Sequence, residues 1–249
     1  MVTSSMAPMH STPKSGRVFS TRKKVRSSDA TTEGRFRLDA VARIVSEVSE
    51  DDVIDLGRAG GGWWIARKIG IDVLREAESR QQLDCQTWAG GMARVAVQRR
   101  VSLAGVGQGC RYEVAATWIA IDQETKRPTP LPEWFGAVYG ESCAGRRLSV
   151  SLTHDDPPET ADQLVWPLRQ VDFDQHQHVN NSSYWPVLEE IMANYEFDRT
   201  TPYRAEIEFR SGVPKAASVD ILVVREGTGL AIWWQVGADI AASAILRHH

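Results

Sequence analysis

The chain has 249 residues, of which 42% are hydrophobic and 24% charged, and its formal net charge is −3. These values are typical of a globular protein with a substantial core. No run of 18 apolar residues predicts a membrane span, and the slight acidity argues against a dedicated nucleic-acid binder. The cysteines Cys85, Cys110 and Cys143 are widely spaced, which indicates reduced thiols rather than a disulfide framework or a zinc site.

Residues 1–16 are rich in Ser, Thr, Pro and Met and contain no acidic residue, so we expect a disordered tail. A transit peptide for plastid targeting is the alternative, because such segments are Ser-rich and acid-poor. The first arginine, however, is Arg17, and no amphipathic stripe is visible. The apolar stretch of a secretory signal is also missing, so we expect a cytoplasmic protein.

The first half of the chain predicts strands and helices in alternation. A strand is expected over residues 17–25, and apolar residues at helical spacing predict a helix over 38–48. Residues 65–78 indicate a second helix. Alternating apolar residues then predict strands over 95–103 and 112–118.

The second half repeats this order. An acidic, Pro-containing linker is expected over 151–163, followed by a strand over 164–172 and a strongly amphipathic helix over 183–197. Further strands are expected over 206–210, 219–224 and 230–236. The shared order favours an internal duplication. Superposing the two copies places Arg26 on Arg169, Asp29 on Asp172, and residues 87–91 on 208–212.

The densest polar cluster of the sequence lies just before the second amphipathic helix. Asp174, His176 and His178 alternate there, so on an extended backbone all three would point the same way. The amino end of the helix supplies free N–H donors that can hold a developing oxyanion. A neighbouring histidine can take a proton from water, and an aspartate can orient that histidine.

Two other interpretations of this cluster stay open. His176 and His178 could bind a metal ion, although such a site needs a further ligand, for which Asp174 is a candidate. The cluster could also be a solvated polar turn that caps the helix through Asn180 or Asn181.

The run from Asp174 to Glu190, D-x-H-x-H-V-N-N-S-S-Y-W-x-x-L-E-E, resembles the catalytic motif D-x-N-x-H-V-N-N-x-x-Y of the acyl-ACP thioesterases. Residues 85–91, 99–100 and 118–128 extend the resemblance, which covers roughly residues 17 to 240. It implies an α+β tandem (double) hot-dog fold, in which an antiparallel sheet wraps around two central helices.

The resemblance further implies a non-catalytic unit over residues 17–140 that holds the acyl chain, and a catalytic unit over 141–249. In the superposed repeat, Arg35 lies over His178 and Glu33 over His176, so the first unit has no equivalent acid–base set.

By the same resemblance, Asp174 and His178 are the catalytic pair, and His176 replaces the family's asparagine. Backbone N–H groups near Asn180 and Asn181 would polarise the thioester carbonyl. Plant members also carry a Glu followed by a Cys in the strand after the helix. Here these positions are Gly212 and Val213, so a cysteine nucleophile is not expected and Glu206 or Glu208 could supply the supporting acid.

The resulting functional prediction is hydrolysis of fatty acyl-ACP thioesters to free fatty acid and carrier protein in fatty acid biosynthesis. No metal ion or organic cofactor is expected. The expected partner is an acyl carrier protein with a fatty acyl-phosphopantetheine; no nucleic-acid partner is expected, and a homodimer is left open. An acyl-CoA thioesterase, a hot-dog dehydratase and a non-catalytic acyl-binding protein remain as alternatives.

Two further groups of residues have a structural and a functional interpretation. Arg94, Arg99 and Arg100 form either a solvated strand face or a docking surface for an acidic carrier. Trp63, Trp64 and Trp88 are either core residues or the lining of a ligand cavity.

Overall fold

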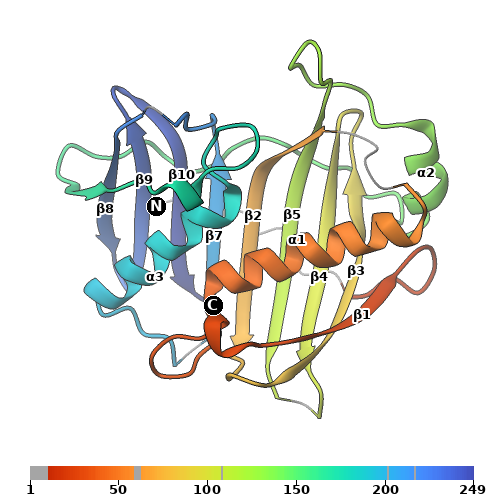
Figure 1. The fold of residues 1–249 in the computed structure, drawn as a ribbon, viewed down its shortest axis with the longest axis horizontal. Helices are drawn as coiled ribbons and strands as arrows, with labels where there is room; N and C mark the ends of the chain where they lie inside the picture. Colours follow the sequence, from red (N-terminus) through yellow and green to blue (C-terminus); the bar gives the residue numbers. More distant parts are fainter. Residues whose placement is uncertain (1–10, 59–62, 108, 201, 216) are drawn as a thin grey trace.

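The computed structural model describes residues 11–58, 63–107, 109–200, 202–215 and 217–249. Within them, one antiparallel sheet has the strand order β1-β3-β4-β5-β2-β7-β10-β9-β8-β6 (Figure 1). The strands are β1 (Phe19–Lys24), β2 (Trp63–Arg75), β3 (Gln82–Met92), β4 (Ala96–Gly105), β5 (Arg111–Ile121), β6 (Asp162–Trp166), β7 (Tyr203–Phe209), β8 (Val219–Glu226), β9 (Gly229–Val236) and β10 (Asp239–His248).

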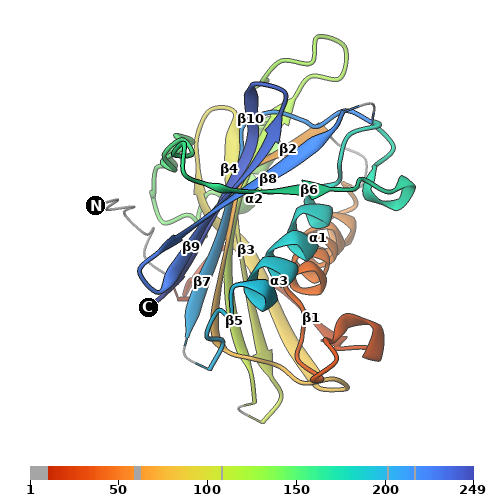
Figure 2. The ribbon, with the colours of Figure 1, turned by 90° about the vertical axis from the view of Figure 1, so that its left-hand side faces the viewer.

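The helices α1 and α3 lie on the same face of this sheet, and α2 lies near the outer end of α1 (Figures 1 and 2). The helices are α1 (Leu38–Asp55), α2 (Glu133–Tyr139) and α3 (Trp185–Asn194), with 3-10 turns η1 (Ser27–Asp29), η2 (Gln170–Asp172) and η3 (Asn181–Tyr184). None of the helices in the described ranges is long and apolar enough to cross a membrane.

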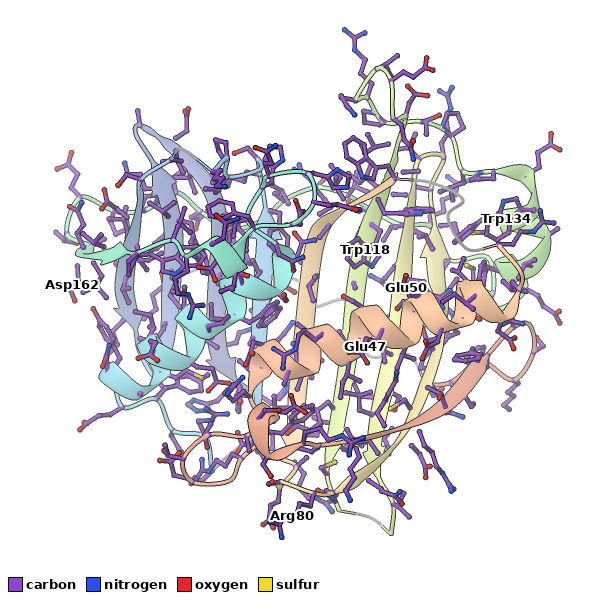
Figure 3. All side chains as sticks on the ribbon, viewed as in Figure 1. Glu47, Glu50, Arg80, Trp118, Trp134 and Asp162 are labelled. Carbon is purple, nitrogen blue, oxygen red and sulfur yellow. The ribbon has the colours of Figure 1, made fainter. Side chains whose placement is uncertain are left out.

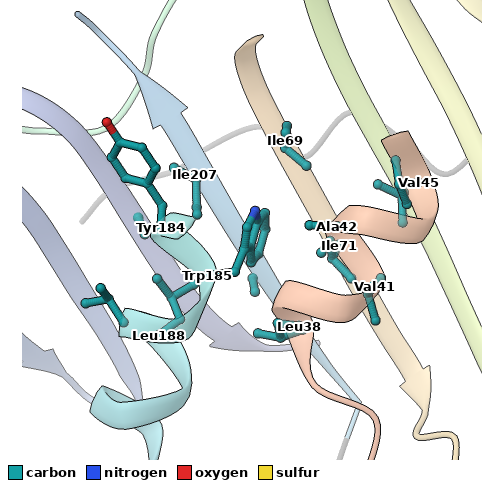
Figure 4. Packing of buried hydrophobic residues seen from close by; sticks show 14 of the residues in the cluster. Leu38, Val41, Ala42, Val45, Ile69, Ile71, Tyr184, Trp185, Leu188 and Ile207 are labelled. Carbon is teal, nitrogen blue, oxygen red and sulfur yellow. The ribbon is translucent and has the colours of Figure 1, made fainter. Parts of the chain in front are cut away.

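The core lies between the sheet and the two helices α1 and α3. Leu38 and Val45 of α1 and Leu188 of α3 belong to the same buried cluster as Ile71 of β2 and Ile207 of β7 (Figure 4). The opposite side of α1 is polar and carries Glu47 and Glu50, both exposed (Figure 3). This apolar stripe with a polar reverse side is what places each helix on the sheet.

The two halves of the chain repeat the same local structure. The Arg26 N–H donates to Asp29 Oδ2 (2.9 Å), and the Arg169 N–H donates to Asp172 Oδ2 (2.7 Å). The superposition of these residue pairs is therefore confirmed. Strand order corrects the other superposition, because residues 87–91 lie in β3, whose counterpart by sheet position is β8, whereas 208–212 lie at the end of β7.

Several element predictions need correction. The helix expected over 65–78 is wrong, because this segment is β2, which pairs with β5 on one side and β7 on the other. Helix α1 continues beyond the expected end at residue 48 to Asp55, close to Gly57 with its φ of +66°. The strand expected over 164–172 ends at Trp166, and β10 was not predicted.

The sheet face opposite the helices is crossed by the segment that connects the two halves. The expected linker over 151–163 bonds to this face: the Trp233 Nε1–H donates to the Asp155 carbonyl oxygen (2.8 Å), and Arg210 Nη2 donates to that of His154 (3.0 Å). Most of the expected tail lies outside the described residues. Within its described part, the Thr12 hydroxyl donates to Gln86 Oε1 (3.2 Å).

Candidate active site

The motif residues form a tight turned loop before η3. The Asp174 N–H donates to the His178 carbonyl oxygen (2.9 Å), and the Gln177 N–H donates to that of Asp174 (3.0 Å). Gln177 has a φ of +61°, in the left-handed region. This segment therefore does not adopt the extended backbone on which Asp174, His176 and His178 would all point the same way.

The carboxylate of Asp174 organises this loop. Its Oδ1 accepts hydrogen bonds from the N–H of His176 (2.8 Å) and from the N–H of His178 (3.3 Å). Among the hydrogen bonds of the described residues, none joins this carboxylate to the imidazole of His178. Asp174 thus holds the main chain that carries both histidines, and both histidine side chains are exposed.

His178 lies against the chain that follows β7. It forms a β-bridge with Pro214, and the next residue, Val179, donates its N–H to the Val213 carbonyl oxygen (2.9 Å). A Cβ added at Gly212 would lie 2.7 Å from Cδ2 of the His178 ring. The position expected for the family's glutamate therefore points at the imidazole, and the glycine leaves room for it.

His176 is held by a residue from the first half of the chain. The indole N–H of Trp63 donates to His176 Nε2, and the two rings lie 4.2 Å apart at 70°. His176 Nε2 is the acceptor of this bond, which an imidazole nitrogen without a proton can provide. The Trp63 ring also contacts Lys126, whose Nζ lies 3.9 Å from the ring centre. The sequence contains no local signal for this long-range contact.

Asn180 and Asn181 have different roles. The Asn180 N–H donates to the Asp172 carbonyl oxygen (2.7 Å), and Asn180 Oδ1 accepts from the N–H (2.9 Å) and hydroxyl (2.7 Å) of Ser182. The capping interpretation is therefore confirmed for Asn180, whose own amide is occupied. Asn181 is the first residue of η3, where helix geometry provides no acceptor for the N–H.

Glu208, which the sequence suggests as a supporting acid, lies on the other face of the sheet and binds Lys68 there. Lys68 Nζ lies 2.8 Å from Glu208 Oε1 and 2.8 Å from Glu206 Oε1. Burial raises the pKa of Glu208, but the hydrogen bonds from Lys68 and from the His154 amide outweigh it and leave the pKa below its usual range. Glu208 fastens the linker through the Thr153 N–H (2.9 Å) and is no longer a candidate for the supporting acid.

The same cluster has the donor types of a metal site. Ligand atoms of His154, Glu206 and Glu208 all lie within 4.8 Å of one another. Lys68 already supplies a positive charge to both carboxylates, and Arg204 Nη2 adds a second at 2.7 Å from Glu206 Oε2. Both carboxylates therefore already have cationic partners within a buried ionic cluster.

The three arginines Arg94, Arg99 and Arg100 form neither a solvated strand face nor a docking surface for a carrier. Arg99 and Arg100 are buried, and Arg99 donates to Asp52 and to the Thr87 hydroxyl (3.0 Å), so neither residue offers a carrier surface. Arg94 alone of the three is exposed. Trp88 is buried in the sheet, whereas Trp63 and Trp64 are partly exposed.

The three cysteines are buried and free. Burial raises the pKa of Cys85 and that of Cys110 to about 11, and it also raises the pKa of Cys143. Their thiols are therefore protonated at neutral pH and are poor nucleophiles.

Solved structures share this architecture. A 12:0-ACP thioesterase from Umbellularia californica matches with a TM-score of 0.76 and 17% identity, over 93% of this chain and 98% of that one. An acyl-ACP thioesterase from Bacteroides thetaiotaomicron matches with a TM-score of 0.70 and 13% identity, also over 93% and 98%. The large antiparallel sheet is thus that of the hot-dog thioesterases.

The sequence matches the acyl-ACP thioesterase N-terminal domain over residues 16–139 and the C-terminal domain over 156–243. The chain therefore belongs to the acyl-ACP thioesterase family. The uncharacterized protein Rv2001 of Mycobacterium tuberculosis is 29% identical over 237 residues, 94% of each chain. Oleoyl-acyl carrier protein thioesterase 2 of Arabidopsis thaliana chloroplasts is 20% identical over 261 residues, 93% of this chain and 70% of the plant protein.

Proposed function

We propose that this protein hydrolyses fatty acyl-ACP thioesters to free fatty acid and carrier protein. The observation that carries the proposal is the exposed His178, held by the Asp174 loop beside Gly212 at the start of the η3–α3 helix. A histidine at the amino end of a helix, in a member of a thioesterase family, combines a base with an oxyanion donor.

In the proposed reaction, His178 takes a proton from water as the water oxygen attacks the thioester carbonyl. The carbonyl oxygen becomes an oxyanion, which the free N–H of Asn181 stabilises. The tetrahedral intermediate then collapses, the C–S bond breaks, and His178 returns the proton to the thiolate. Asp174 keeps the loop in place and His176 lines the polar side of the site. Every step uses groups of this chain and water.

We further propose that the chain is a tandem of two hot-dog units, residues 17–140 around α1 and residues 141–249 around α3. The repeated hydrogen bonds of Arg26 and Arg169 and the strand order support this division. An acyl carrier protein as partner is part of the proposal, because the family name points to acyl-carrier substrates. A cytoplasmic location is a separate proposal, which follows from the sequence alone.

The test is incubation with a ladder of acyl-ACPs and the matching acyl-CoAs, with free fatty acids measured by mass spectrometry. We expect acid release from acyl-ACP, and loss of that release in His178→Ala. Faster turnover of acyl-CoA would reassign the carrier. Hydration of a 2-enoyl thioester without hydrolysis would identify a dehydratase. Binding of acyl-ACP without any acid release would identify an acyl-binding protein and overturn the proposal.

A further inference from the structure

Each half of the chain has its own copy of the site loop. In the second half, the Asp174 N–H donates to the His178 carbonyl oxygen (2.9 Å), and the His178 N–H donates to Asp174 Oδ1 (3.3 Å). In the first half, the Thr31 N–H donates to the Arg35 carbonyl oxygen (2.7 Å), and the Arg35 N–H donates to the Thr31 hydroxyl oxygen (3.2 Å). The two loops are therefore equivalent residue by residue.

The helix start that follows the first loop is closed by a carboxylate. Leu38 begins α1, as Asn181 begins η3, and the Leu38 N–H donates to Glu189 Oε1 (2.6 Å). Glu189 belongs to α3 and its side chain is 11% exposed. Arg199 Nη1 donates to its other oxygen (2.6 Å). An anion thus already occupies the amino end of α1, where the helix dipole and free amides favour negative charge.

Among the described residues, the site loop of the second half has no such carboxylate beside its helix start. The repeat places Ser46 of α1 where α3 has Glu189, in step with the buried neighbours Val45 and Leu188. Helix α1, which carries Ser46, packs against η3, which begins at Asn181. Ser46 is exposed, and its hydroxyl donates to the Ala42 carbonyl oxygen of its own helix (3.2 Å).

A second pair of equivalent positions shows the same difference. The Phe36 N–H donates to the Ala77 carbonyl oxygen (2.9 Å), as the Val179 N–H donates to that of Val213 (2.9 Å). Glu76, which precedes Ala77, is therefore equivalent to the residue before Val213, which is Gly212. Glu76 Oε1 binds Arg199 Nη2 (2.9 Å), so ion pairs fill the first-half site. The equivalent positions at the second-half site are Ser46 and Gly212.

We propose that Ser46 is a positioning residue that keeps the Asn181 amide open to the substrate's thioester carbonyl, whereas Glu189 closes the equivalent amide of Leu38. This inference rests on the proposed function. It explains why only one of two equivalent loops has an accessible oxyanion donor. It also places the reacting carbonyl between the exposed side of α1 at Ser46 and the loop of His178.

The test is Ser46→Glu, which introduces into the second half the carboxylate that closes the first. Loss of an oxyanion donor typically costs about 10²–10³-fold in kcat, so we expect a loss of that order. Ser46→Gln has the same bulk without the charge and should be at least roughly tenfold more active than Ser46→Glu, because a charged acceptor binds an amide more strongly. Ile54→Glu adds a charge to an exposed site near the other end of α1 and controls for charge alone.

A second readout does not depend on turnover. In Ser46→Glu, the Asn181 amide proton resonance should move with pH as the new carboxyl group titrates. An Asn181 resonance that does not respond, or a Ser46→Glu variant with wild-type kcat, would overturn the inference. If the wild type hydrolyses no thioester, the proposed function fails, and the Asn181 resonance alone decides whether position 46 controls this amide.

Discussion

Gly212 and the imidazole of His178 are so close that any side chain at 212 would meet the ring, since a Cβ there would lie 2.7 Å from Cδ2. This contact fixes one wall of the proposed site. On the Gly212 side the contact involves main-chain atoms, which cannot turn away, so a side chain added there would have to displace the His178 ring. The position of the His178 ring therefore depends on the absence of a side chain at position 212.

Gly212→Ala should displace the imidazole from the site. Misplacement of a catalytic group by about 1 Å can cost 10²-fold in rate, so we expect kcat to fall by roughly 10- to 100-fold. The substrate pocket is not altered, so KM should change much less. Steady-state kinetics with one acyl-ACP would measure both constants. A variant with wild-type kcat would show that the ring is free to move at no cost.

His178→Ala should lower kcat/KM by about 10²–10⁴-fold, the usual contribution of a general base. His176→Asn should keep much of the activity, because the amide oxygen of asparagine can also accept the hydrogen bond from the Trp63 indole. His176→Ala leaves that N–H without an acceptor and should be worse than His176→Asn. The order of the three kcat/KM values, measured at substrate concentrations well below KM with circular dichroism as the folding control, checks the assignment.

Asp174→Asn and Asp174→Ala separate two roles of the aspartate. The structure shows Asp174 Oδ1 accepting two main-chain N–H bonds, which an asparagine oxygen can also accept. Asp174→Asn should therefore retain more activity than Asp174→Ala, which loses both bonds at about 0.5–1.5 kcal/mol each. The measurement is kcat/KM together with the free energy of unfolding. Equal inactivation of both variants would instead indicate that the negative charge itself is required.

The ionic cluster on the outer face predicts an acid-sensitive contribution to stability. Because the pKa of Glu208 is lower in the folded protein, its contribution is present above the unfolded pKa, about 4.3, and is lost as the pH falls through the folded value. Glu208→Gln should cost about 1–3 kcal/mol near neutral pH and lose less on acidification than the wild type. Urea unfolding near pH 7 and near pH 4 measures this.

The control for that experiment is Glu50→Gln, on the exposed side of α1 (Figure 3). An exposed carboxylate contributes little to stability, so this variant should follow the wild-type curve at both pH values. If Glu208→Gln also follows it, the cluster does not stabilise the seam between the halves.

Local patterns in the sequence predicted the local structures well. The apolar stripes predicted α1 and α3, and the Arg26 and Asp29 pair was correctly matched to Arg169 and Asp172, because helix periodicity and turn capping depend on neighbouring residues. The pattern over residues 65–78 predicts a helix where the structure has strand β2, since a strand covered on both faces lacks a clean polar–apolar alternation.

The candidate site was only partly predictable, because local patterns do not report contacts between distant segments. The motif identified Asp174 and His178, but the left-handed Gln177 turns the loop and redirects their side chains. The contact between Trp63 and His176 joins positions 113 residues apart, and the role of Glu189 depends on the start of another helix, 151 residues away. No spacing rule within one segment can predict such contacts.

The pairing of β2 with β7 makes each half the permanent partner of the other. Lys68 pairs with Glu208 across this ladder (2.8 Å), and Asp72 pairs with Arg204 (3.0 Å). Two separate chains joined in this way would dissociate on dilution, whereas a covalent connection holds their local concentration constant. The Trp63–His176 contact should therefore survive at any protein concentration, and the specific activity should not decline on dilution.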